Sequence, residues 1–360
     1  MPMTLPPPLP YSPEIETLQD DEGETLAAIN ASFDEILQTT HEDYGRAVRA
    51  VHAKAHGILE GIFTVADVLP PELVQGLFAA PSSHRAYLRI STNPGDILDD
   101  AVALPRGLAL KVLDVEGERL PGAQGSTQDF IMVNGPIFTA PDAKKFAGNL
   151  KLLAKTTDRA EGAKVAASKV LQVVNAALGA VGMESTALAG LGGAPQVDPL
   201  GETYFSVTPF RYGEYVAKFR LRPVSSALTE LTGAKIRTKG HPDAIRERVQ
   251  QEMAGIDAEW AFEVQLRRDA DRQPIEDASV EWKEDHAPFV EVARLRVPRQ
   301  DSWDADRVRA VDEDMRFSVW TGLAAHRPLG GINRARRDAY QHSADFRAAA
   351  NGCPMREPTT

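Results

Sequence analysis

Two histidines lie four positions apart in a basic stretch near the amino terminus. His52 and His56 fall within residues 49–57. On a helix this spacing would place both imidazoles on one face, where they could bind a metal ion. However, the glutamate of a zinc-protease motif is missing, and Gly57 disfavours a helix. We therefore interpret the two histidines as a structural or surface pair and keep metal binding as the less favoured hypothesis.

Two further polar patterns have ordinary structural explanations. Arg336 and Tyr340 are four residues apart, so they share a helix face, and Arg347 lies about two turns further along it. Considered alone, this pattern is typical of a solvated basic helix with one packed tyrosine. Asn134 precedes a Gly-Pro turn, where asparagine is common because its side chain caps local backbone groups.

Composition and charge exclude several classes of protein. The chain has 360 residues, with 40 basic and 51 acidic side chains, and its net charge of −11 argues against nucleic-acid binding. The single cysteine, Cys353, excludes an internal disulfide framework and a multi-cysteine metal cluster. No signal peptide and no apolar run of membrane-spanning length is evident. We therefore expect a cytoplasmic protein without a membrane span.

Two common catalytic or cofactor motifs are also disfavoured. The glycine-rich stretch at 190–193 does not follow a strand and open a helix, as a dinucleotide-binding loop requires. The Gly-x-Ser-x-Gly elbow of serine hydrolases does not occur.

The spacing of apolar residues predicts a mixed α+β protein. Helical spacing recurs from Leu26 to Leu37, and further helices are predicted at 143–153, 164–178, 242–253 and 333–349. Strands are predicted at 58–65, 87–91, 108–112, 204–209, 215–221, 262–266 and 290–297. Because helices are inserted between distant strands, we expect an antiparallel barrel rather than alternating βαβ units. We also expect a flexible arm at 1–23, one domain at 24–350 and a tail at 351–360.

Read in order, several segments resemble the catalase superfamily. Residues 49–54 resemble the stretch that carries the family's distal histidine, here His52, and residues 129–138 resemble the stretch with the distal asparagine, here Asn134. Residues 88–92, 105–111, 142–146, 260–265 and 288–295 resemble further segments of the family. The likeness runs from Tyr44 to Arg347, and it is closest to the compact catalase-related haem proteins. It implies an eight-stranded antiparallel β-barrel of the catalase type with inserted and C-terminal helices.

The resemblance implies haem b with a tyrosinate as the axial iron ligand. The family pattern is Arg-x-x-x-Tyr with another arginine seven residues after the tyrosine. Two registers fit this spacing: Arg336, Tyr340 and Arg347, or Arg316, Trp320 and Arg327. We choose Tyr340 as the metal ligand, because an indole offers only an N–H donor and cannot serve as a phenolate.

The resemblance also implies roles for the residues around the haem. His52 would move a proton between the peroxide oxygens, Ser91 would orient the imidazole, and Asn134 would donate a hydrogen bond to the peroxide. Arg336 would favour the phenolate form of Tyr340. The other candidate haem contacts are Arg49, Arg89 and Arg347 at the propionates, Val51, and Phe138 and Phe146, which ordinary core packing explains equally well.

We therefore predict a haem-dependent peroxidase with some catalase activity. It would reduce hydrogen peroxide or organic hydroperoxides through a ferryl intermediate, using a small-molecule electron donor, and it could form a homo-oligomer. Val133 and Gly135 depart from the catalase residues that flank the distal asparagine, which favours donor oxidation over fast catalase turnover.

Three alternatives stay open. The first is a fatty-acid hydroperoxide isomerase or lyase of the allene oxide synthase type. That branch has a threonine before the distal histidine, whereas this chain has Val51, which favours the peroxidase. The second is a non-catalytic haem carrier or sensor. The third is a ligand-binding α+β barrel without haem.

Overall fold

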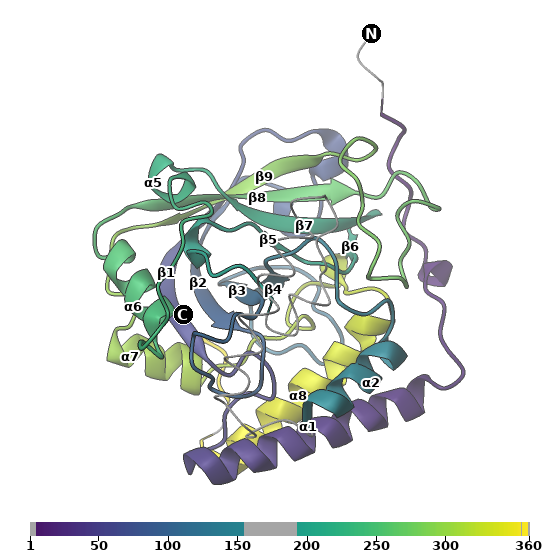
Figure 1. The fold of residues 1–360 in the computed structure, drawn as a ribbon. Helices are drawn as coiled ribbons and strands as arrows, with labels where there is room; N and C mark the ends of the chain where they lie inside the picture. The colour runs from purple at the N-terminus through teal and green to yellow at the C-terminus, as the bar shows by residue number, and fades with distance from the viewer. Residues whose placement is uncertain (1–4, 155–192, 354, 359–360) are drawn as a thin grey trace.

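A closed antiparallel β-barrel forms the body of the protein in the computed structural model, which describes residues 5–154, 193–353 and 355–358 (Figure 1). The sheet order is β5-β4-β3-β2-β1-β9-β8-β7-β6. A further pairing of β5 with β7 closes eight of these strands into a ring, and β6 lies outside it. The predicted eight-stranded barrel is therefore confirmed. The strands are β1 (Ala55–Val65), β2 (Ser83–Thr92), β3 (Arg106–Val112), β4 (Gln128–Val133), β5 (Tyr204–Phe205), β6 (Phe210–Tyr212), β7 (Tyr215–Pro223), β8 (Ala258–Leu266) and β9 (Phe289–Val297).

Three long helices pack together on one side of the barrel (Figure 1). These are α1 (Glu22–Tyr44), α2 (Ala143–Ala154) and α8 (Gly331–Asn351). Their shared apolar cluster includes Phe33 and Ile36 of α1, Leu150 of α2 and Ala339 of α8. The helix spacing seen in the sequence produces this packing, because residues three and four apart face the same neighbour.

The remaining helices are short or lie beside β1. The helix α6 (Ala244–Met253) packs against β1, and α5 (Ser226–Thr229) and α7 (Ala305–Arg307) are single turns. A π-helical turn, Val308–Glu313, directly follows α7. Single 3₁₀ turns occur at Pro13–Ile15, Pro71–Leu73, Gly76–Phe78, Pro199–Gly201 and Ala324–His326. The helix predicted at 164–178 and residues 190–192 of the glycine-rich stretch lie outside the described residues.

One sequence prediction about local structure is wrong. The strand predicted at 204–209 is broken, because Val207 has a φ of 55° and the Thr208 N–H donates to the Ser206 carbonyl at 2.7 Å instead of to a neighbouring strand. No helix carries both His52 and His56, as Gly57 indicated, because α1 ends at Tyr44 with Gly45 in the left-handed conformation. His56 lies in β1.

Both ends of the described chain are bonded to the body of the protein. The N–H of Leu9 donates to the carbonyl of Arg267 at 2.8 Å, and Glu16 forms ion pairs with Arg327 and Arg334. Near the carboxyl terminus, Arg356 bonds to Asp314 through the backbone. No described helix is both long and apolar enough to cross a membrane.

Candidate functional site

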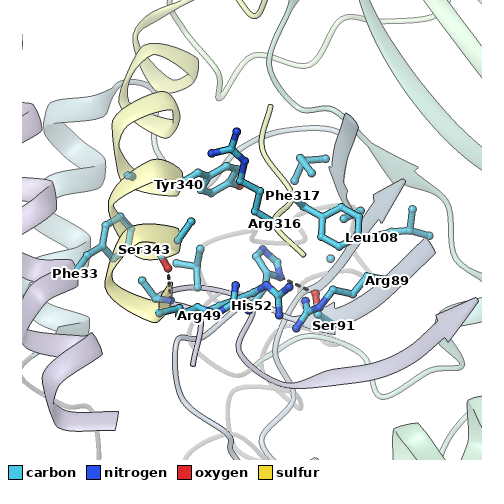
Figure 2. A pocket seen from close by; sticks show the side chains of 18 of the residues that line it. Phe33, Arg49, His52, Arg89, Ser91, Leu108, Arg316, Phe317, Tyr340 and Ser343 are labelled. Carbon is cyan, nitrogen blue, oxygen red and sulfur yellow. Dashed lines mark hydrogen bonds between the residues drawn. The ribbon is translucent and has the colours of Figure 1, made fainter. Parts of the chain in front are cut away.

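A cavity lies between the barrel wall and the helices α1 and α8 (Figure 2). It contains about 660 Å³ of empty space, part of which is open to solvent. The strands β2, β3 and β4 supply one wall, and α8 supplies another. The lining residues are Phe33, Arg49, Ala50, Val51, His52, Arg89, Ser91, Gly107, Leu108, Ala109, Ile131, Met132, Arg316, Phe317, Ala339, Tyr340, Ser343, Ala344 and Arg347.

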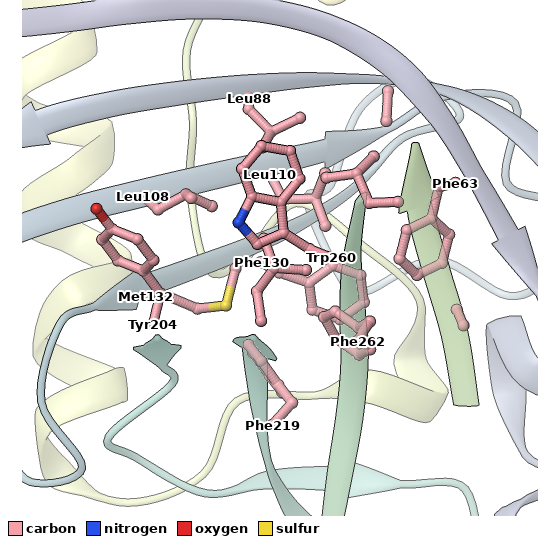
Figure 3. Packing of buried hydrophobic residues seen from close by; sticks show 14 of the residues in the cluster. Phe63, Leu88, Leu108, Leu110, Phe130, Met132, Tyr204, Phe219, Trp260 and Phe262 are labelled. Atoms are coloured by element: carbon pink, nitrogen blue, oxygen red, sulfur yellow. The ribbon is translucent and has the colours of Figure 1, made fainter. Parts of the chain in front are cut away.

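The interior of the barrel is filled by its own side chains and offers no comparable space (Figure 3). The ring centroids of Phe130 and Phe262 are 4.7 Å apart, and those of Phe219 and Phe262 are 5.5 Å apart. Trp260 is almost fully buried in the same cluster. Close packing of this kind leaves a ligand only the space outside the barrel wall.

His52 enters the cavity from the loop that joins α1 to β1. Its φ of 54° is unusual for a residue with a side chain, and its N–H donates to the carbonyl of Asn93 at 2.7 Å. The imidazole Nδ1 is 3.1 Å from the Ser91 hydroxyl oxygen. The ring also lies against Gly107, where an added Cβ would be 2.4 Å from the His52 Cε1. The predicted contact with Ser91 is thus present, and a glycine on β3 makes room for the ring.

Burial makes His52 a neutral side chain at physiological pH. It lowers the pKa of the imidazole to about 3, and the positive charges of Arg89, Arg336 and Arg49 lower it in the same direction. A neutral imidazole has one nitrogen free to accept a proton. The cavity therefore presents a neutral imidazole with one nitrogen free to accept, and the lowered pKa makes it a weak base.

His56 is not among the residues that line the cavity. It is fully buried, and its Nε2 is 3.1 Å from the Thr92 hydroxyl oxygen. No group of three or more metal-ligating His, Cys, Asp or Glu side chains occurs within the described ranges. The less favoured hypothesis of a shared His52–His56 metal site therefore gains no support from the structure.

Tyr340 projects into the cavity from α8 (Figure 2). Its phenol oxygen accepts hydrogen bonds from the Arg336 Nη2 at 3.1 Å and Nε at 3.3 Å. Arg336 is in turn held by the Asn333 oxygen at 3.2 Å. Trp320, the other residue that the spacing allowed, is not among the lining residues and lies under the Arg337 guanidinium. Of the two candidate residues, Tyr340 lines the cavity and Trp320 does not.

Three arginines of the cavity wall converge on Asp312 and its backbone. The Arg89 Nε is 2.7 Å from the Asp312 Oδ1, and Arg49 pairs with the same oxygen. Arg347 donates to the backbone carbonyls of Asp312 and Glu313, at 3.1 and 2.6 Å. The Asp312 side chain is half-buried. Burial raises its pKa, but the charges of Arg89 and Arg49 outweigh this effect and lower the pKa to about 2.

The converging arginines carry more positive charge than their shared partner neutralises. Burial and repulsion from Arg89 and Arg347 lower the pKa of Arg49. Three guanidinium groups and one carboxylate leave an excess of two positive charges. Because buried charges need partners, this wall fits a ligand with two anionic groups.

The remaining residues that the sequence assigned to the haem site do not all line the cavity. Val51 lines the cavity, but Asn134, Phe138 and Phe146 are not among the lining residues. The rings of Phe138 and Phe146 are 5.4 Å apart and belong to the apolar cluster between the helices. Packing in that cluster is the alternative explanation that the sequence left open for these two rings.

Two hydrogen bonds hold the Asn134 side chain. Its Oδ1 accepts from the Arg106 N–H at 2.7 Å, and its Nδ2 donates to Glu202 at 2.7 Å. Asn134 follows Val133, which pairs with Gly107 across β3 and β4. The residue before Asn134 thus lies opposite the glycine that contacts the His52 ring.

Sequence reasoning missed several residues of the site. Asp312 and Glu202 lie far along the chain from their partners and belong to no motif that we recognised. Ser343 and Ala344 could have been found, since they follow Tyr340 at helical spacing and lead to Arg347 on one face of α8. Phe317 directly follows Arg316 in the alternative register.

The barrel, its strand outside the ring and the surrounding helices together define a catalase-like fold. Catalase A from Saccharomyces cerevisiae is similar, with a TM-score of 0.58 and 16% identity, over 87% of this chain and 63% of that one. A fungal catalase is similar with a TM-score of 0.58 and 16% identity, over 88% of this chain and 61% of that one. A bacterial catalase is similar with a TM-score of 0.58 and 17% identity, over 98% of this chain and 67% of that one. The chain thus spans less than two thirds of the first two structures. No protein-family model and no curated protein sequence matches it.

Proposed function

We propose that the protein binds haem b in this cavity and acts as a peroxidase with some catalase activity. The observation that supports the proposal is the arrangement of Tyr340 and His52 on one cavity, each with a fixed hydrogen-bonding partner, next to an excess of arginine charge. Solved catalases share the fold, although their low identity to this chain shows nothing about its activity.

The residues of the cavity fit the parts of a haem. Tyr340 would ligate the haem iron, and the two hydrogen bonds from Arg336 would hold its oxygen in place. Arg49, Arg89 and Arg347 would bind the two propionates, whose charge matches their excess. When bound, the haem would supply the redox chemistry that splits the peroxide bond.

His52 would handle the proton. Neutral at physiological pH, it would accept a proton at Nε2 from one peroxide oxygen and return it to the other. The Ser91 hydroxyl can accept from Nδ1–H, which fixes the tautomer with Nε2 free. Asn134 would donate a hydrogen bond to the bound peroxide, and a small-molecule donor would supply the electrons.

The absorption spectrum of the purified, haem-supplemented protein tests this proposal most directly. We expect a Soret band, a spectral change on addition of hydrogen peroxide, and oxidation of a donor such as guaiacol. Protein that binds no haem contradicts the proposal and favours a ligand-binding barrel. Turnover of a fatty-acid hydroperoxide without any donor favours the isomerase or lyase, and haem binding without peroxide reactivity favours a carrier or sensor.

A further inference from the structure

The carboxyl group next to Asn134 has no role in the proposed mechanism. Glu202 lies two residues before Tyr204 of β5, and its Oε1 accepts from the Asn134 Nδ2 at 2.7 Å. The other oxygen, Oε2, is buried and has no hydrogen-bond partner within the described residues. A buried carboxylate oxygen without a partner costs free energy, so its presence beside a candidate site calls for a physical explanation.

Two partners on different segments fix the orientation of the Asn134 amide. Its Oδ1 accepts from the backbone N–H of Arg106, and its Nδ2 donates to Glu202. A flipped amide would place Nδ2 against the Arg106 N–H and Oδ1 against a carboxylate oxygen, so donor would meet donor and acceptor would meet acceptor. Glu202 accepts one Nδ2 hydrogen, and no described residue accepts the second.

The chain next to Asn134 passes close to His52. Val133, the residue before Asn134, pairs with Gly107, and Gly107 lies against the His52 ring. A ligand bound next to His52 would supply an acceptor for the second Nδ2 hydrogen.

We propose that Glu202 is a positioning residue whose carboxylate holds the Asn134 amide so that one N–H points to a peroxide beside His52. This role rests on the proposed function, which supplies the peroxide. Glu202 itself touches neither the peroxide nor the cofactor in this proposal and acts only through Asn134.

The charges around Glu202 make this role sensitive to pH. Burial raises the pKa of Glu202 to about 7, while the Arg106 guanidinium and the Asn134 hydrogen bond lower it and Asp198 raises it further. Tyr204, which is buried beside these groups, also interacts with Glu202. A protonated carboxyl is a weaker acceptor than a carboxylate, so the hold on Asn134 weakens as the pH falls through about 7.

The first test uses haem-free protein and does not depend on activity. Infrared difference spectra between about pH 5 and pH 9 detect the C=O stretch of a protonated carboxyl group, and Glu202→Gln identifies the band of Glu202 by removing it. Because the bond from Asn134 lowers the Glu202 pKa, Asn134→Ala is expected to move the midpoint of this band to higher pH. An unchanged midpoint in Asn134→Ala overturns the proposal.

The second test is a double-mutant cycle on haem-loaded protein. Glu202→Gln is expected to lower kcat/KM for hydrogen peroxide about tenfold, the effect of one well-placed hydrogen bond, and to flatten its pH dependence near neutrality. In the Asn134→Ala background, Glu202→Gln should cause no further loss, because it acts only through the amide. Glu230→Gln, an exposed residue, controls for the change in net charge.

The outcomes separate the two proposals. If the wild-type protein is active but the losses of kcat/KM from Glu202→Gln and Asn134→Ala add up in the double variant, the role of Glu202 is overturned and the proposed function is not. A haem-loaded wild-type protein that does not reduce peroxide overturns the proposed function and this role with it.

Discussion

Tyr340 and His52 each have one neighbour that determines how the side chain can react. Arg336 donates two hydrogen bonds to the phenol oxygen of Tyr340, and the Ser91 hydroxyl lies 3.1 Å from the imidazole Nδ1 of His52. The guanidinium stays charged over the whole physiological range and keeps donating to the phenol oxygen. The imidazole is kept neutral by burial. The two side chains thus present different groups to whatever the cavity binds, a phenol oxygen and a neutral imidazole.

Replacing Tyr340 by Phe keeps the ring and removes the oxygen. We expect the Tyr340→Phe protein to lose stable haem binding, because no phenolate remains to ligate the iron, and a haem titration followed at the Soret band measures this. Trp320→Phe is the matched control and should bind haem like the wild type. Loss of haem in the control with normal binding in Tyr340→Phe would show that the Trp320 register is the correct one.

Replacing His52 by Ala removes the base and leaves the arginines and Tyr340 in place. We expect bound haem with a slower reaction with hydrogen peroxide, by about 10²–10⁴-fold, which is the usual contribution of a positioned acid–base group. Stopped-flow absorbance measures the rate. His241→Ala changes an exposed histidine and should react like the wild type. An unchanged rate in His52→Ala would remove the role proposed for this residue.

At the scale of the elements, the site depends on strands that approach a loop very closely. β2 supplies Ser91 and Arg89, and β3 supplies Gly107, which leaves room for the His52 ring. The π-helical turn at 308–313 places Asp312 between the arginines of β2, α8 and the loop after α1. Such irregular turns are frequent at functional sites, and here the turn supplies the Asp312 carboxylate to Arg49 and Arg89 and two backbone carbonyls to Arg347.

Gly107→Ala tests the close approach of β3 to His52. The added Cβ would be 2.4 Å from the His52 Cε1, so the ring must move away from its place beside Ser91. We expect a loss of peroxide reactivity of about tenfold or more, with haem still bound, measured by stopped-flow absorbance and by thermal unfolding.

Gly148→Ala is the matched control for this substitution. Gly148 lies in α2, an added Cβ there meets nothing within 4 Å, and alanine favours a helix. The control should keep the wild-type rate and unfold at the same or a slightly higher temperature. A wild-type rate in Gly107→Ala would show that the ring tolerates displacement.

At the scale of the whole molecule, the barrel is a packed support and the site lies on its outer wall. The aromatic rings inside it leave no room for a large ligand, and His326 is buried among them beside Phe78 and Tyr212. Its Nε2 accepts from the Leu77 N–H at 3.0 Å, which requires the neutral imidazole. The stability of the barrel therefore depends on His326 staying unprotonated.

His326 makes the barrel less stable in acid. Burial lowers its pKa to about 4, below the value of the unfolded chain, so the stabilisation is complete above about pH 6.5 and is lost as the pH falls toward 4. We expect the free energy of unfolding to fall by up to about 3 kcal/mol more in the wild type than in His326→Gln over this range. Denaturant unfolding at both pH values measures the difference. The other titrating groups are common to both proteins, so equal pH dependence in the two would contradict the prediction.

The sequence by itself determined the barrel class, most of the strands and long helices, and the side chains that could do chemistry. These features depend on local periodicity and on residue type, which a linear sequence contains. Tyr340 was preferred over Trp320 for the same reason, since an indole cannot replace a phenolate.

Only the tertiary structure decided which groups meet. The contact of Asn134 with Glu202 joins residues 68 positions apart, and that of Arg89 with Asp312 joins residues 223 positions apart. The left-handed backbone of His52 and Val207 depends in the same way on distant partners, which stabilise a conformation that local preference disfavours. Closure of the barrel brings these separated segments into contact, and the spacing of residues along the chain does not predict such contacts.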